Sequence, residues 1–132
     1  MKYFIGNWKM FGVPKSLNIL NKINSFSSKD KNRNKYKVIM TPPYTLIESY
    51  AKHFKNKKIS IGSQNCYQKD QFSSNTAAVS PYMLRNVGAK YTLVGHSDNR
   101  AEGDTNLMLK NKVKFSLKNN LRVVFCIGEN KR

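Results

Sequence analysis

The chain has 132 residues, of which 39% are hydrophobic and 23% are charged, so it is long enough for one domain with a core and too short for two. Lysine and arginine number 24 against 7 aspartates and glutamates, which gives a formal net charge of +17. No apolar run approaches the roughly 18 residues that a membrane-spanning helix needs.

The positive charge has two interpretations. It is typical of proteins that bind nucleic acid or an anionic membrane, but here it comes mostly from scattered lysines accompanied by many asparagines. Lysine and asparagine enriched together favour a general bias of amino-acid composition over a binding patch, so the charge alone does not indicate a nucleic-acid partner. Too few apolar residues separate Lys2 from Gly6 for a secretory signal, and Cys66 and Cys126 are far apart. We therefore expect a cytoplasmic chain with buried, reduced thiols.

Five short apolar runs predict β-strands, and four amphipathic segments between them predict α-helices. The expected strands are residues 3–8, 38–40, 59–64, 91–94 and 123–129. The expected helices begin at Pro14, at Pro43, at the cap pair Ser80–Pro81 and at Asp104–Thr105. Gly88 and Asn119–Asn120 suit the left-handed turn at a helix exit. The polar segments 27–37 and 65–79 predict loops.

Each expected helix carries apolar residues at helical spacing. These are Leu17, Leu20 and Ile23 in the first helix, Leu46, Ile47, Tyr50, Ala51 and Phe54 in the second, Met83, Leu84 and Val87 in the third, and Leu109, Val113 and Leu117 in the fourth. His53 falls on the polar side of the second helix, so we expect it to be solvated.

Strict alternation of strands and helices, without a hairpin signal, predicts an α/β fold with a parallel sheet. The strands begin near residues 3, 37, 59, 91 and 122, which spaces the units by about 30 residues. Eight such units need roughly 240 residues, the typical length of an eight-fold βα barrel. The chain is therefore expected to form a partial barrel of about four βα units plus a fifth strand, with residues 1–132 as half of a single domain.

The run Tyr91–Arg100 ends a buried strand at Gly95 and then presents an imidazole, a hydroxyl, a carboxylate and a guanidinium within five residues. Polar groups at the carboxyl end of a buried strand are where α/β folds place their chemistry. An ordinary polar turn with a solvated histidine explains this decapeptide equally well.

Motifs at successive strand ends decide between these interpretations, because together they resemble the triosephosphate isomerase family in order and spacing. They are Phe4-Ile5-Gly6-Asn7-Trp8-Lys9-Met10, Thr41-Pro42-Pro43, Gln64-Asn65-Cys66-Tyr67, Ser80-Pro81 with Met83-Leu84, Val94-Gly95-His96-Ser97, and Cys126-Ile127-Gly128-Glu129. The resemblance covers the whole chain. It implies a TIM-barrel fold and interconversion of dihydroxyacetone phosphate and glyceraldehyde 3-phosphate through an enediolate, without metal or cofactor. It also implies a homodimer, formed through the loop around Thr76.

The resemblance also assigns roles to single residues. Asn7 and Lys9 would line the substrate pocket, with the Lys9 ammonium facing the charge of the enediolate. His96 would be the electrophile that polarises the carbonyl and moves protons between the two oxygens. It would act as a neutral imidazole at the start of a helix, for which this enzyme is a known example. Ser97 and Asp98 would support it.

Several positions depart from the family pattern. Asp98 stands where the family usually has glutamate, which shortens its reach by one methylene, and Asn99 replaces an arginine. The loop Ser73–Ala78 keeps Thr76 but lacks the usual Gly-Glu pair, so we expect an altered dimer contact. The chain's glutamates are Glu48, Glu102 and Glu129; none lies in the motif of the family's general base, and Glu129 is interpreted as structural.

We therefore expect this chain alone to be inactive, and its open sheet edges to invite association. Two alternatives stay open. The first is a basic half-barrel that binds RNA or another polyanion without catalysis. The second is an enzyme of two chains, in which another polypeptide supplies the remaining strands and the base.

Overall fold

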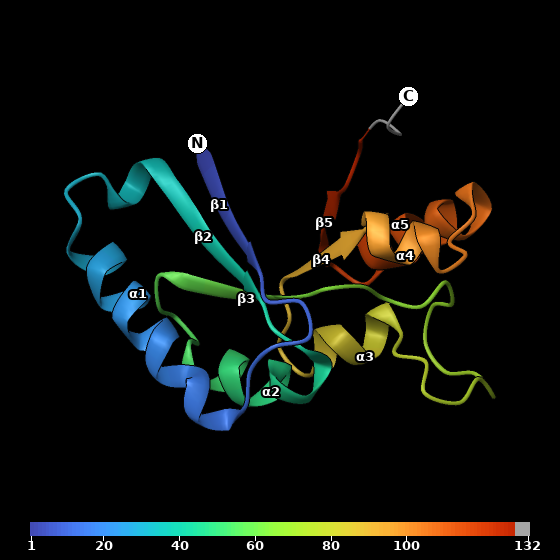
Figure 1. Cartoon of the computed structure of the whole chain (residues 1–132), viewed down its shortest axis with the longest axis horizontal. Helices are drawn as coiled ribbons and strands as arrows, with labels where there is room; N and C mark the ends of the chain where they lie inside the picture. Colours follow the sequence, from blue (N-terminus) through green and yellow to red (C-terminus); the bar gives the residue numbers. More distant parts are fainter. Residues whose placement is uncertain (129–132) are drawn as a thin grey trace.

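The structure is a computed structural model, and it describes residues 1–128. Five parallel strands form one sheet in the order β1-β2-β3-β4-β5, and the sheet curls into a half-barrel with helices on its outer side (Figure 1). The strands are β1 (Lys2–Asn7), β2 (Tyr36–Thr41), β3 (Ile59–Ser63), β4 (Tyr91–Val94) and β5 (Arg122–Phe125). The helices are α1 (Leu17–Lys29), α2 (Tyr44–His53), α3 (Pro81–Asn86), α4 (Ser97–Ala101) and α5 (Asn106–Lys118). The predicted α/β half-barrel is confirmed.

The hydrophobic core lies between the outer face of the sheet and the helices. It includes Leu20 of α1, Leu46, Ile47 and Tyr50 of α2, Leu84 of α3, Leu109 of α5, and Val38, Met40, Ile59, Ile61 and Val94 of the strands. Each such side chain contributes about 1.5–3 kcal/mol of hydrophobic free energy when fully buried. The apolar spacing in the first two helices thus predicted the faces that pack, whereas in α3 Leu84 is buried but Met83 is 40% exposed.

The caps predicted for α3 and α5 are confirmed, whereas Pro14 opens a 3₁₀ turn (Pro14–Ser16) ahead of α1, and Pro43 precedes the first residue of α2. The Ser80 hydroxyl accepts a hydrogen bond from the Met83 amide, and the Thr105 hydroxyl accepts one from the Met108 amide, each at 3.2 Å. After α3 the chain turns at Gly88, whose φ of +96° favours glycine and where a Cβ would lie 2.8 Å from the Ala51 Cβ. These local signals fix where α3 and α5 begin and where α3 ends.

The expectation of a structureless loop at 27–37 is wrong. Helix α1 continues to Lys29, and Arg33–Lys35 form a 3₁₀ turn that leads into β2. The Asp30 carboxylate accepts a hydrogen bond from the Asn32 amide at 2.9 Å, which makes the turn after the helix. From the residue before the neighbouring strand β3, the Lys58 ammonium donates to the carbonyl oxygens of Arg33 and Tyr36. Asp30 and Lys58 thus satisfy backbone groups of this segment, whereas residues 31–35 are exposed.

His53 is also not solvated as expected. Its ring is half-buried, with Nε2 2.8 Å from the Asn21 Oδ1 and the ring edge against Phe54. The histidine joins the end of α2 to α1.

The core-facing row of α5 differs from the predicted one. Leu109 is buried, but the next buried residues are Lys112 and Ser116, whereas Val113 is half-buried and Leu117 is 57% exposed. Lys112 can lie inside because its ammonium has three polar partners there, described below. The helix is therefore rotated relative to the one that its apolar residues predicted.

Cys66 is buried as expected, whereas Cys126 is only half-buried, and both are free thiols. Burial raises the pKa of each thiol. Within residues 1–128 no helix combines the length and apolarity needed to cross a membrane. The predicted fifth strand ends at Phe125 rather than at 129, and Glu129 lies outside the described residues.

Candidate active site

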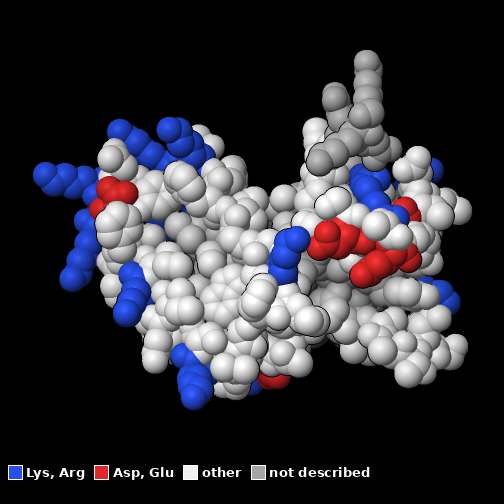
Figure 2. All heavy atoms as spheres, in the orientation of Figure 1, with Lys and Arg blue, Asp and Glu red and all other residues white. Residues whose placement is uncertain are grey.

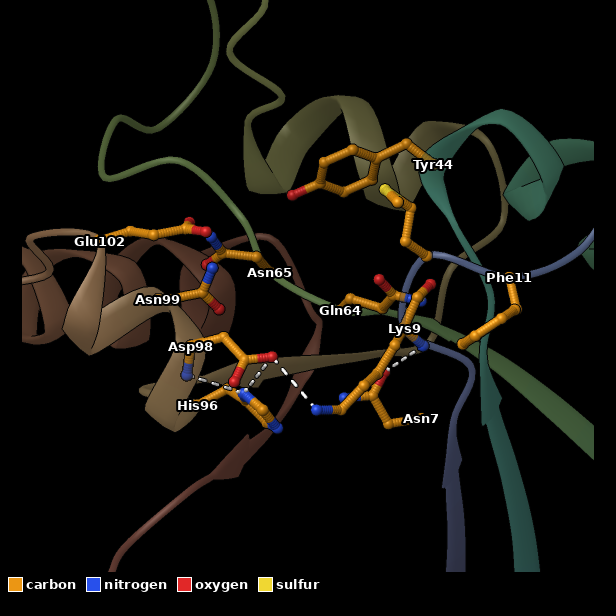
Figure 3. A pocket seen from close by; sticks show the side chains of 11 residues that line it. Asn7, Lys9, Phe11, Tyr44, Gln64, Asn65, His96, Asp98, Asn99 and Glu102 are labelled. Carbon is orange, nitrogen blue, oxygen red and sulfur yellow. Dashed lines mark hydrogen bonds and ion pairs between the residues drawn. The ribbon is translucent and has the colours of Figure 1, made fainter. Parts of the chain in front are cut away.

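A cavity of about 540 Å³ lies at the carboxyl ends of the strands, where the loops after β1, β3 and β4 converge (Figure 3). This is the end of a βα barrel at which active sites are built. Its lining residues are Asn7, Lys9, Met10, Phe11, Tyr44, Gln64, Asn65, His96, Asp98, Asn99 and Glu102. Segments separated by almost ninety residues thus meet at one cavity.

The backbone at Lys9 is strained. Its φ is +51°, a region that L-residues rarely adopt and that costs about 1–3 kcal/mol for a side chain other than glycine. Two hydrogen bonds hold it: the Lys9 backbone amide donates to the Asn7 Oδ1 at 2.9 Å, and the Gln64 side-chain amide donates to the Lys9 carbonyl oxygen at 2.7 Å. The same Gln64 nitrogen also donates to the Thr41 carbonyl oxygen at 2.9 Å. The result is a lysine side chain directed toward the cavity from the end of β1 (Figure 3).

His96 caps the short helix α4. Its Nδ1 accepts a hydrogen bond from the Asp98 backbone amide at 3.1 Å, so in the neutral ring the proton lies on Nε2, where it can be donated. The preceding Gly95 has a φ of +78° and leaves space for Arg100, whose guanidinium donates to the carbonyl oxygens of Gly95 and Cys126 at 2.7 and 3.1 Å. Arg100 therefore fixes the turn that orients the imidazole.

Asp98 lies between the two catalytic candidates and contacts each with a different group. Its carboxylate Oδ2 lies 3.3 Å from the Lys9 Nζ, so the shorter side chain still reaches Lys9, and its backbone amide donates to the His96 Nδ1 (Figure 3). Both side chains of the Lys9–Asp98 pair are 58% exposed. Exposed pairs of this kind stabilise a protein by about 0–1 kcal/mol. The Lys9 ammonium can therefore leave Asp98 for an anionic ligand at little cost.

A buried ion pair supports the floor of the site. The Lys112 ammonium lies 2.7 Å from both carboxylate oxygens of Asp104 and 3.0 Å from the Asn65 Oδ1. Asn65 follows Gln64, the residue that holds the Lys9 backbone. Helix α5 thereby anchors the beginning of the long β3–α3 loop, residues 64–80.

Most residues that the sequence pointed to come together. Asn7, Lys9, His96 and Asp98 line one cavity, whereas Ser97 is the exposed first residue of α4 and does not line it. Among the glutamates, Glu48 pairs with Lys52 on α2, at 2.6 Å and outside the cavity, whereas Glu102 lines it.

Sequence reasoning missed the contributions of Gln64, Arg100 and Glu102. Gln64 and Arg100 act through backbone carbonyls, which no residue pattern reveals, although Gln64 directly follows β3 and Arg100 lies in the helix after β4. Across residues 1–128 no three histidine, cysteine, aspartate or glutamate side chains gather where they could hold a metal ion.

The family model of triosephosphate isomerase matches residues 2–132 of the chain. The chain belongs to the triosephosphate isomerase family. It is 37% identical over 130 residues to the triosephosphate isomerase of Cytophaga hutchinsonii, covering 97% of this chain and 51% of that one. Identity with the Wolbachia pipientis wMel triosephosphate isomerase is 34% over 127 residues, covering 96% and 49%.

The fold agrees with this assignment. The crystal structure of triosephosphate isomerase from Bartonella henselae superimposes with a TM-score of 0.87 at 27% identity, over 97% of this chain and 52% of that one. The chain thus spans about half the length of the triosephosphate isomerases that it matches.

Proposed function

We propose that this chain forms one wall of the active site of a triosephosphate isomerase, as the amino-terminal half of a single barrel domain at residues 1–132. The substrates would be dihydroxyacetone phosphate and D-glyceraldehyde 3-phosphate. The observation that carries the proposal is the convergence of Lys9, after β1, and His96, after β4, on one cavity, where the Asp98 carboxylate contacts Lys9 and the Asp98 backbone amide donates to His96.

Both side chains suit a reaction that develops negative charge on oxygen. When a base removes a proton from the carbon beside the carbonyl, the electron pair moves onto the carbonyl oxygen and gives an enediolate. The His96 Nε2 proton would be donated to that oxygen, and the ring would then pass a proton between the two oxygens. The Lys9 ammonium would stabilise the charge electrostatically. Asn7 contributes by holding the Lys9 amide.

The general base is the part that these residues do not supply. Glu102 lines the cavity, but it follows the short helix α4 and lies on the side of the cavity away from Lys9 (Figure 3). A positioned base typically contributes about 10²–10⁴-fold to the rate. We therefore expect the chain alone to be inactive, and a polypeptide with the family's remaining strands to supply the base.

An isomerisation assay tests this proposal in two arms. The 132-residue chain is assayed alone and mixed with the carboxyl-terminal half of the Cytophaga hutchinsonii relative, with glyceraldehyde 3-phosphate as substrate. We expect no turnover alone, and turnover in the mixture that falls at least about 10²-fold with His96→Gln. Turnover of the chain alone that is lost with Glu102→Gln would instead make Glu102 the base. A mixture that stays inactive, or is indifferent to His96→Gln, would refute the proposal.

We further propose a cytoplasmic homodimer whose contact includes the exposed loop tip around Thr76. Dimerisation should then weaken with Thr76→Glu in sedimentation equilibrium and stay unchanged with Ser28→Glu on α1. The alternative of a polyanion-binding half-barrel has no support from the relatives, which are all triosephosphate isomerases.

A further inference from the structure

A second cavity, of about 460 Å³, lies at the end of the strands opposite the candidate site. Residues between 48 and 61, from α2 to β3, and between 85 and 90, from the end of α3 to the start of β4, line it. We call it the α2–α3 cavity. Its walls come from neighbouring elements in the middle of the sheet, so it is not part of the edges at β1 and β5. Its volume falls in the range of small-molecule sites, about 300–1,000 Å³.

Positive charge dominates the α2–α3 cavity. One carboxylate and four cationic side chains line it, namely Glu48, Lys52, Lys55, Arg85 and Lys90. Glu48 is paired with Lys52 at 2.6 Å, and among residues 1–128 the other three cations form no ion pair. Figure 2 shows acidic side chains gathered instead over α4, beside the candidate site. Three cations therefore line this cavity without a carboxylate to neutralise them.

Helix ends explain only part of this charge. Helices α2 and α3 both end at the cavity, and a cation near a helix C-terminus offsets the partial negative charge there. Lys52 and Arg85 lie in the last turns, and the Arg85 guanidinium donates to the Ala89 carbonyl oxygen at 3.4 Å. Lys55 and Lys90 lie outside both helices. Two helix ends of about half a negative charge each leave the cavity with roughly two positive charges.

Apolar groups form much of the remaining wall. Ala51 and Val87 line the cavity and are half-buried, so part of each stays accessible. Phe54, Ile59 and Ile61 also contribute, although each is at most 2% exposed. A site that combines an apolar wall with a few polar groups is typical of small-molecule binding. The ligand that fits has an anionic group and an apolar body.

We propose that the α2–α3 cavity binds a phosphate monoester with an aromatic or apolar body, such as a nucleoside monophosphate. A phosphate monoester carries about −1.5 to −2 charge at pH 7, which matches the charge of the cavity. Its oxygens would contact Lys55, Arg85 and Lys90, with the planar guanidinium able to bind two of them. The body would lie against Ala51 and Val87. The cavity is remote from Lys9 and His96, so the inference does not depend on the isomerase proposal.

Equilibrium dialysis of the full 132-residue chain with radiolabelled AMP tests the proposal. Unlabelled adenosine and inorganic phosphate are the competitors, because each contains only one of the two parts of AMP. We expect saturable binding of AMP at low ionic strength, where charge interactions are least screened. Adenosine and inorganic phosphate should each compete at least about tenfold more weakly than unlabelled AMP.

Two double variants locate the binding. Lys55→Met/Lys90→Met removes two cations of the cavity and should weaken AMP binding at least about tenfold. Lys22→Met/Lys110→Met is the matched control, because it removes the same charge from exposed positions on α1 and α5 that do not line the cavity. It should leave the affinity for AMP within about twofold of the parent. Circular dichroism confirms that both variants are folded.

Three results would overturn the proposal. The absence of saturable AMP binding would show that the cavity does not take this class of ligand. Competition by inorganic phosphate as strong as that by AMP would mean that the apolar wall contributes nothing. Equal losses in the two double variants would mean that AMP is attracted by the net charge of the chain.

Discussion

Two lysine–aspartate pairs in this chain share their chemistry and differ in their surroundings. In the Lys112–Asp104 pair the side chains are 4% and 8% exposed, and the ammonium contacts both carboxylate oxygens and Asn65. In the Lys9–Asp98 pair both side chains are 58% exposed, and one contact of 3.3 Å joins them. The buried pair cannot separate without leaving a charge in the core. The exposed pair can exchange partners, which is what a ligand-binding cation needs.

Breaking the buried pair should have the largest effect on stability. Lys112→Met leaves the Asp104 carboxylate buried without its cation, so the free energy of unfolding should fall by about 3–5 kcal/mol in urea titrations. The double variant Lys112→Met/Asp104→Leu should recover much of the loss, because no charge then stays buried. Lys110→Met, exposed on the same helix, is the control and should change little. A similar loss with Lys110→Met would show that the burial of the pair is not the cause.

Removing the strain at Lys9 should have a smaller effect of the opposite sign. Lys9→Gly suits the φ of +51° and should raise the free energy of unfolding by about 1 kcal/mol. Lys9→Ala keeps the strain and should give no such gain. Both variants should abolish turnover in the two-part isomerase assay. Equal stability of the glycine and alanine variants would mean that the backbone at Lys9 stores no strain.

Breaking the exposed pair should barely change stability. Asp98→Asn removes the Lys9 contact but leaves the amide that hydrogen-bonds the His96 Nδ1, so the free energy of unfolding should stay within about 0.5 kcal/mol of the parent. Its effect should appear instead in the two-part assay as a higher KM, because Asp98 no longer holds the Lys9 ammonium in position for the substrate. A loss above about 2 kcal/mol would contradict the comparison.

In a third pair, Lys118–Asp70, the exposure of the carboxylate lies between those of the other two, and the pair's contribution to stability should depend on pH. Hydrogen bonds from Lys118 and Asn119 lower the pKa of Asp70 below its ordinary value of 3.8. A carboxyl whose folded pKa is depressed stabilises the fold above its unfolded pKa, and that stabilisation is lost as the pH falls through the folded pKa. Asp70→Asn should therefore be less stable than the parent near about pH 6, and the difference should shrink toward about pH 3. Urea titrations at both pH values measure it.

Features that depend on nearby residues could be predicted from the sequence, and those that depend on distant partners could not. Strand positions and helix caps were predictable because they depend on residues close in sequence. Ser80 accepts from the Met83 amide and Thr105 from the Met108 amide, each three residues further on. The rotation of α5 was not predictable, because a lysine is assigned to the surface unless its partners are known. Of the two partners, Asp104 precedes the helix and Asn65 lies in the β3–α3 loop. The prediction of a loop at 27–37 was wrong for the same reason, because Lys58, which is remote in sequence, satisfies a carbonyl of this segment.

The candidate site likewise contains residues that the sequence predicts and residues that only the fold reveals. Lys9 and His96 stand out through motifs at strand ends. The hydrogen bonds that fix them come from Gln64 and Arg100 to backbone carbonyls, which only the folded chain brings within reach.

The attachment of the β3–α3 loop to α5 has a consequence for proteolysis. Asn65 contacts Lys112, and Asp70 contacts Lys118 and Asn119, whereas residues 71–77 are exposed. A protease should therefore cut first between residues 71 and 77. The two pieces should nevertheless stay together, because β3 still pairs with β4 and the Asn65 and Asp70 contacts with α5 lie before the cut. A nicked sample should elute as one species under native conditions and separate into two only in denaturant.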